Sequence, residues 1–176
     1  MVAGYHSAAM DEIAERAGVS KPVLYQHFPS KLDLYLNVVD QHIDVLIDQV
    51  RVALNSTSDN HERVRATIAA YFAFVESEGE GFRLLFESDL IAQPEVRQRL
   101  DRLNNECAKA ISDVIAEDTG LPGEAAMLLA VSLIGNAQVA ARYWQNNESH
   151  LPRGGAADLV ANLTWRGISG FPKSSN

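Results

Sequence analysis

Cysteine is almost missing from this chain of 176 residues, and that scarcity excludes several kinds of site. The single residue, Cys107, cannot form an intrachain disulfide or a thiolate-cluster zinc site, which agrees with a reducing compartment. The five histidines have none of the spacings that hold a metal, such as i and i+4. We therefore expect no metal site, and we expect Cys107 to be a small buried hydrophobe rather than a nucleophile.

The sequence also shows no signal-peptide pattern, and we expect no apolar run in it to span a membrane. Residues 1–10 do not have the charged-then-apolar layout of a signal sequence, so we expect a cytoplasmic protein. No convincing strand is present, and no glycine-rich phosphate loop follows one. With 47% hydrophobic residues the chain can bury a substantial core. We predict an all-α protein that is not an enzyme and holds no cofactor.

Two short helical patterns meet at a tight turn within residues 10–36. Ile13 and Ala17 mark the apolar face of the first pattern, and Gly18 can take the positive φ that ends a helix without a Cβ clash. Ser20 is placed to cap the second helix. This arrangement predicts a helix-turn-helix.

The second helix of the pair divides into an inner and an outer face. Leu24 and Phe28, four residues apart, are expected to pack against the first helix. The remaining side chains then face outward and suit a helix lying in the major groove. Amine and amide groups among them can hydrogen-bond to base edges, and the phenol and the imidazole can reach phosphates. These outward residues are Lys21, Pro22, Val23, Tyr25, Gln26 and His27.

A second phosphate contact is expected just after this helix. Ser30 and Asp33 have the spacing of a capping box, and Lys31 lies beside the free backbone N–H groups of the next helix. A helical hairpin in some other all-α domain has a similar pattern, so the motif alone leaves that alternative open.

The stretch DEIAERAGVSKPVLYQHFPSKLDLY, residues 11–35, resembles the DNA-binding signature of the TetR (tetracycline-repressor) family of transcriptional regulators. The resemblance covers roughly residues 4–36. It implies base contacts by Lys21, Pro22 and Tyr25 and backbone contacts by Val23, Tyr25, His27 and Lys31, with Gln26 as the variable reader. It also implies a DNA-binding domain over 1–36, joined by a long helix to an effector-binding and dimerisation domain over 37–176.

The N-terminus departs from that family pattern. Only three residues precede Gly4-Tyr5, where the resemblance implies a further helix packed behind the motif. We expect this first helix to be missing from the sequence. Its loss would leave the motif helices less stable and would weaken DNA binding.

Charge is unfavourable for nucleic-acid binding at first sight. The net charge is −8, and residues 1–54 hold four basic against seven acidic side chains. The charges are segregated, however. Asp40, Asp44 and Asp48 recur at i+4 along a helix leading away from the motif, whereas Lys21 and Lys31 lie near it. We expect binding by a dimer that contacts few phosphates.

Apolar periodicity predicts six further helices. Their expected ranges are 31–54, 59–78, 82–91, 93–119, 122–145 and a last helix that ends near Gly170.

Aromatic and amide side chains on these helices suggest a ligand pocket. Amides on apolar faces must be satisfied when buried, and a ligand, a water or the opposite subunit can do so. Aromatics at helical spacing are more commonly core, and the polar groups can equally bind their own chain. The candidates are Tyr71, Phe74, Phe86, Asn104, Asn136 and Arg142.

The helix over 122–145 is apolar nearly all round. Between Ala125 and Ala141 its only polar side chains are Ser132, Asn136 and Gln138, so both of its sides need cover. It resembles, with the last helix, the pair through which family members form a four-helix dimer interface. The candidate interface residues are Ala130, Ile134, Ala137, Ala141, Leu159 and Leu163.

These observations favour a homodimeric transcriptional regulator that binds a double-stranded DNA operator. We expect it to act as a repressor and to respond to a small-molecule effector. The alternative is an all-α dimeric interaction protein that has lost DNA binding.

Overall fold

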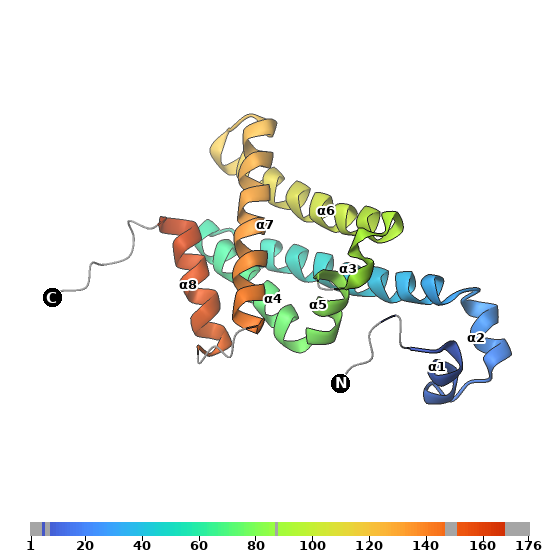
Figure 1. Ribbon diagram of the computed structural model, residues 1–176. Coiled ribbons are helices and arrows are strands. Elements are labelled where there is room, and N and C mark those ends of the chain that lie inside the picture. Colours follow the sequence, from blue (N-terminus) through green and yellow to red (C-terminus); the bar gives the residue numbers. More distant parts are fainter. Residues whose placement is uncertain (1–4, 6–7, 87, 147–150, 168–176) are drawn as a thin grey trace.

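The computed structural model describes residues 5, 8–86, 88–146 and 151–167, and every regular element among them is a helix (Figure 1). The all-α prediction is therefore confirmed. In chain order the elements are α1 (Met10–Arg16), α2 (Lys21–His27), α3 (Lys31–Asn55), α4 (Asn60–Ser77), α5 (Gly79–Phe86), the 3-10 helix η2 (Asp89–Ala92), α6 (Pro94–Thr119), α7 (Gly123–Asn146) and α8 (Arg153–Arg166).

The turn of the helix-turn-helix has the geometry that its sequence predicts. Gly18 has φ +68°, its N–H donates to the Glu15 carbonyl at 3.1 Å, and the Val19 N–H donates to the Ala14 carbonyl at 3.0 Å. This pair of bonds is a Schellman motif, which satisfies the last carbonyl groups of α1. Ser20 occupies the N-cap position of α2, but its side chain makes no capping hydrogen bond.

Helix α1 and helix α2 share a small hydrophobic cluster, which we call the N-terminal cluster. Its buried members are Met10, Ala14 and Leu24, with Ile13, Phe28 and Leu34 partly buried around them. Ala17, expected on the inner face, is exposed. The correction has a simple cause: Ala17 is the C-cap of α1, beyond the point where α2 crosses at Ala14.

Helix α3 is a single 25-residue helix that connects the two ends of the molecule. The Asp33 N–H donates to Ser30 Oγ at 3.1 Å, which confirms the expected cap at its start. Leu34 packs on the N-terminal cluster, whereas Tyr35 and Leu36 already belong to the main core. The domain boundary predicted after residue 36 therefore falls inside a continuous helix.

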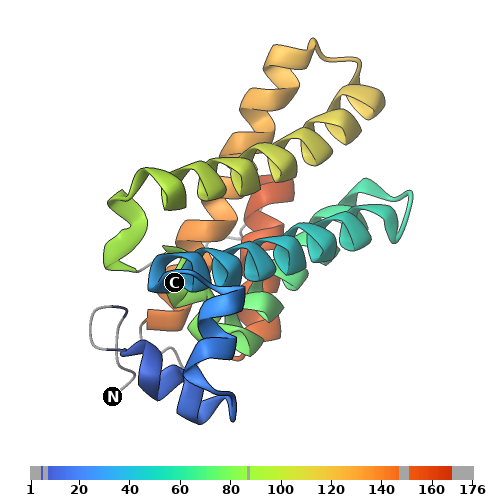
Figure 2. The same cartoon turned by 90° about the vertical axis from the view of Figure 1, so that its right-hand side faces the viewer.

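The main core lies among α3, α4, α6, α7 and α8, with α5 and η2 at its edge (Figures 1 and 2). Phe72, Phe74 and Val75 of α4 are completely buried. Small side chains let α8 approach α4, since Ala157 and Ala161 are both buried. The hairpin formed by α6 and α7 projects beyond the rest of the molecule in both views.

Two helix ranges differ from the prediction. The segment expected as one helix over 82–91 contains α5 and the separate 3-10 helix η2. Helix α8 ends at Arg166, because Gly167 takes a left-handed φ of +66°. The predicted end near Gly170 lies outside the described residues.

Arginines of α6 neutralise the acidic stripe of α3. Arg99 Nε lies 2.9 Å from Asp40 Oδ2, and Arg102 Nη2 lies 2.9 Å from Asp44 Oδ1. In a third pair the basic residue belongs to α3 and the acidic one to α6: Arg51 lies 2.7 Å from Glu106. The negative charge that seemed unfavourable for nucleic-acid binding is thus partly used to fasten α6 to α3.

Candidate nucleic-acid interface and ligand cavity

Helix α2 presents its predicted recognition side chains to solvent at one end of the molecule (Figure 1). Only Leu24 turns inward, and Lys31 at the start of α3 is half-buried. The exposed residues include a cation, a phenol, an amide and an imidazole, a set able to contact both phosphates and base edges. The exposed set is Lys21, Pro22, Val23, Tyr25, Gln26 and His27.

Lys21 has an acidic partner within the motif. Its Nζ lies 2.8 Å from Asp11 Oδ1 of α1, and the hydrogen bond and charge of Asp11 raise the pKa of Lys21. Both side chains are more than half exposed, so solvent screens the pair strongly. A phosphate reaching Lys21 must therefore compete with Asp11.

Lys31 is oriented by an aromatic ring. Its Nζ lies 4.5 Å from the centre of the Tyr5 ring, which in turn stands edge-on to Tyr35 at 5.3 Å. Such a cation–π contact restricts the lysine without removing its charge. Lys31 is the first residue of α3, and the dipole at this end of the helix also favours an anion.

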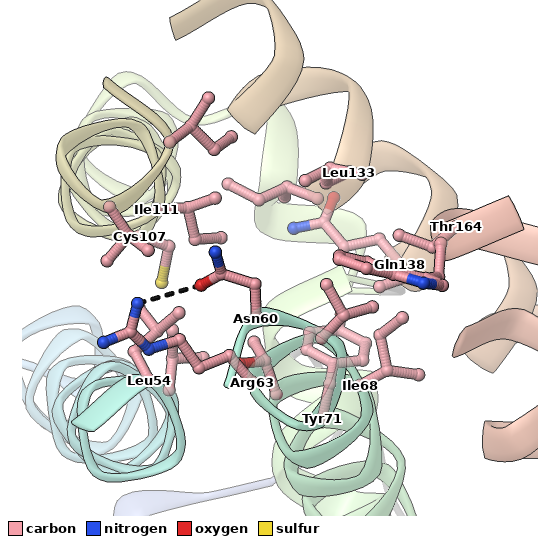
Figure 3. A pocket seen from close by; sticks show the side chains of 18 of the residues that line it. Leu54, Asn60, Arg63, Ile68, Tyr71, Cys107, Ile111, Leu133, Gln138 and Thr164 are labelled. Atoms are coloured by element: carbon pink, nitrogen blue, oxygen red, sulfur yellow. Dashed lines mark hydrogen bonds between the residues drawn. The ribbon is translucent and has the colours of Figure 1, made fainter. Parts of the chain in front are cut away.

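A cavity of about 410 Å³ lies inside the C-terminal part of the molecule. Five helices wall it: α3, α4, α6, α7 and α8. Figure 3 shows Tyr71 and Ile68 of α4 facing Cys107 and Ile111 of α6 across this space. Most of the lining is aliphatic, which suits a largely apolar ligand.

Polar groups of the cavity are mostly paired with one another. Arg63 Nη1 donates to Asn60 Oδ1 at 2.9 Å (Figure 3) and also to Asp118 Oδ2 at 3.2 Å. Gln138 Nε2 of α7 donates to Asn104 Oδ1 of α6 at 3.0 Å. The Arg63–Asp118 pair joins α4 to α6 and the Gln138–Asn104 pair joins α7 to α6, whereas Arg63 and Asn60 both belong to α4.

The structure brings only part of the predicted pocket set together. Tyr71 and Asn104 line the cavity. Phe74 is completely buried elsewhere in the core, and Phe86 packs at its edge. Asn136 donates to Thr164 Oγ1 at 2.9 Å.

Arg142, the last of that set, is exposed on α7 and does not line the cavity. Sequence reasoning also missed the other lining residues of α4, among them Arg63 and Thr67. Their spacing at i−8 and i−4 from Tyr71 is the signal that would have found them, because such residues share one helix face.

Cys107 lies in the cavity wall as a buried thiol. Burial, and to a smaller extent Glu106, raises its pKa to about 11, so at neutral pH it is protonated and unreactive. Among the residues that the structure describes, no group of three or more His, Cys, Asp or Glu side chains is placed to hold a metal.

The outer face of α7 carries exposed apolar side chains. Leu128, Val139 and Tyr143 are 68%, 60% and 69% exposed, and Val131 lies beside them. At 100° per residue these positions form one stripe along the helix. Leu159 and Leu163 of α8 are exposed as well. By length and composition α7 is apolar enough to cross a membrane.

The predicted interface alanines lie on the opposite side of α7. Ala130, Ala137 and Ala141 are buried within the protomer, and Ile134 lines the cavity. This differs from the expectation for a physical reason: small side chains allow close helix contact wherever it occurs, and here they admit the neighbouring helices of the same chain.

Two sequence-family matches cover most of the chain. Residues 2–38 match the bacterial regulatory proteins of the tetR family, and residues 60–167 match a tetracyclin repressor-like C-terminal domain. The chain belongs to the TetR family. The resemblance found in the motif is thus confirmed, and the protein is a DNA-binding transcriptional regulator with an N-terminal helix-turn-helix.

One relative within the family is similar over nearly the whole chain. The HTH-type transcriptional activator FasR of Mycolicibacterium smegmatis is 45% identical over 169 residues, which are 96% of this chain and 77% of FasR.

Solved TetR-family structures share the fold. A regulator from Streptomyces coelicolor aligns with a TM-score of 0.75 at 24% identity, covering 91% of this chain and 70% of that one. FadR from Bacillus subtilis, solved in complex with stearoyl-CoA, aligns with a TM-score of 0.76 at 18% identity, covering 94% of this chain and 91% of FadR.

Proposed function

We propose that this TetR-family protein is a homodimeric, cytoplasmic regulator that binds operator DNA through α2 and is controlled by a long-chain acyl ligand. The cavity carries this proposal. It is largely aliphatic, it is lined by five helices, and its volume of about 410 Å³ lies within the range of small-molecule sites. The stearoyl-CoA held by FadR, a protein of the same fold, supports the ligand class. No catalytic role is proposed.

Helix α3 offers a direct connection between ligand and DNA. Leu46, Val50 and Leu54 of α3 line the cavity, while the first turn of the same helix holds Lys31 and packs on the N-terminal cluster. A ligand that prefers one tilt of α3 thereby shifts the population of protomers able to bind DNA. It can do so only by its difference in affinity for the two states, for which about 1–3 kcal/mol is typical.

The exposed apolar stripe of α7 supports the homodimer. Leu159 and Leu163 of α8, a helix that contacts α7, are exposed too, and exposed apolar side chains in such numbers mark a protein interface. Val139→Glu should yield monomers in analytical ultracentrifugation. Val52→Glu is the matched control, because Val52 is 71% exposed on α3, away from this surface. Intact Val139→Glu dimers would place the interface elsewhere.

For the direction of regulation, we propose activation in place of the repression expected from the sequence. The 45% identical relative is named an activator, and no residue of this chain by itself favours repression. A promoter–reporter strain with the gene deleted and restored decides the point. Lower reporter output in the deletion strain supports activation, and higher output supports repression.

The central experiment measures operator affinity by fluorescence anisotropy with and without hexadecanoyl-CoA. We expect the ligand to weaken DNA binding of the wild type. Ile111→Trp, which fills the cavity from α6, should retain DNA binding but lose the response. DNA affinity unchanged by ligand would refute acyl control. No operator binding by the wild type at all would favour the alternative of an interaction protein that has lost DNA recognition.

A further inference from the structure

Two hydroxyl groups in the cavity wall have no hydrogen-bond partner. Thr67 Oγ1 and Tyr71 Oη are both inaccessible to solvent, and neither meets a donor or acceptor in the structure. Both residues line the cavity, and Tyr71 as a whole is only 7% exposed. Because they stand four residues apart on α4, the two groups lie on the same side of that helix.

The other polar side chains of the lining contrast with this pair. Arg63 donates to both Asn60 and Asp118, and Gln138 donates to Asn104. Buried polar groups in proteins are nearly always satisfied, and those that are not point to a function. The two unpaired hydroxyls therefore differ from the other polar lining residues named above, which bond to one another, and from the apolar side chains around them.

The chemistry of the two hydroxyls defines the group that they can bind. Burial raises the pKa of the Tyr71 phenol, so at neutral pH it is a hydrogen-bond donor. The Thr67 hydroxyl both donates and accepts. An oxygen atom of a ligand that reaches either hydroxyl can accept a hydrogen bond from it, whereas a plain hydrocarbon segment leaves both hydroxyls unsatisfied.

We propose that Thr67 and Tyr71 bind an oxygen atom on the ligand and so make the cavity selective for oxygen-bearing chains over plain hydrocarbon. This inference rests on the acyl ligand of the proposed function and specifies what the ligand must present inside the cavity. The oxygen can be the carbonyl at the head of the acyl chain or a hydroxyl further along it. Both sources share the same recognition chemistry.

Three probes distinguish these sources by calorimetry. Hexadecanoyl-CoA carries the carbonyl, S-hexadecyl-CoA is the thioether without it, and 3-hydroxyhexadecanoyl-CoA adds a chain hydroxyl. We expect the wild type to bind at least one oxygen-bearing probe about tenfold more tightly than its partner lacking that oxygen, which is the size of one net hydrogen bond. Whichever pair shows the difference identifies the source.

Variants that remove one hydroxyl each complete the test. Tyr71→Phe and Thr67→Val keep the shape of the side chain, and both should reduce the affinity ratio toward one while binding of S-hexadecyl-CoA stays unchanged. Tyr35→Phe is the control, because it removes a buried hydroxyl that is outside the cavity and donates to the Leu84 carbonyl. Its ratio should equal that of the wild type.

The possible failures are distinct. If the wild type binds all three probes equally and they still weaken DNA binding, the oxygen selectivity is wrong and acyl control stands. The same holds if the ratio survives in both hydroxyl variants. If no probe binds, both the selectivity and the acyl ligand are refuted.

Discussion

The two ends of α3 are stabilised very differently. At its start, α1 and α2 are held by the N-terminal cluster, in which the described buried side chains are Met10, Ala14 and Leu24. Further along, α3 contributes to a continuous core that reaches α4, α6, α7 and α8. Since stability grows with the apolar area buried, the DNA-binding end should open locally far more often than the cavity end. The proposed recognition helix thus lies in the part expected to be less stable, and the proposed ligand cavity in the part expected to be more stable.

The largest effect is expected from a large deletion in the main core. Phe72 has no exposed surface, so Phe72→Ala should lower the free energy of unfolding by about 3–5 kcal/mol. Urea denaturation followed by circular dichroism at fixed protein concentration measures this. A loss below about 1 kcal/mol would show that the main core is not the stable region.

A core deletion at the other end should act more locally. Leu24→Ala should cost the N-terminal cluster about 2–5 kcal/mol, abolish operator binding and remove the hydrogen-exchange protection of residues 10–28. The main unfolding transition should remain. Leu121→Ala, which truncates an exposed leucine after α6, should change neither property. If Leu24→Ala shifts the main transition as much as Phe72→Ala does, the two regions unfold as one.

Alkaline pH should selectively weaken the cavity end. The folded state keeps Cys107 protonated up to about pH 11, whereas the unfolded thiol ionises near its ordinary value. The stability from this group is therefore fully present below about pH 8.5 and is lost as the pH rises to about 11, by about 3 kcal/mol at most. Comparing unfolding at pH 8 and pH 10.5 tests this. Cys107→Ala should show a smaller loss, and an equal loss would assign the effect to other groups.

The smallest expected effect concerns the charge balance of the DNA-binding end. Asp11→Asn removes the acidic partner of Lys21 and one negative charge near the DNA, so operator affinity should rise roughly two- to fivefold at low salt. Asp101→Asn makes the same charge change on an exposed site of α6. An equal rise in both variants would mean that net charge, rather than the Lys21 pair, is responsible.

The helix-turn-helix could be predicted closely because its signals are local. Gly18 determines the turn after α1, and Ser30 determines the cap of α3. The spacing from Ala14 to Leu24 determines the contact between α1 and α2. Long helices followed from periodicity for the same reason.

The cavity and the outer face of α7 could not be predicted in the same way. Periodicity shows which side of a helix is apolar, but an unfilled space depends on how five helices meet. Phe74 and Tyr71 are three residues apart on α4, yet the first fills the core and the second borders the cavity. The alanines of α7 marked a close helix contact, but nothing in the sequence says whether the partner helix comes from the same chain.

The unbroken length of α3 also determines how far a tilt at the cavity moves the DNA-binding end of the helix. From Val50 in the cavity wall to Lys31 is 19 residues of helix, or about 28 Å at 1.5 Å per residue. A tilt of about 5° at the cavity would swing Lys31 by roughly 2–3 Å if the helix stays rigid. That is close to the rise of one base pair, about 3.4 Å along the duplex. A small change in the cavity wall that tilts α3 can thus move the recognition helix by most of a base step, because the rigid helix acts as a lever arm.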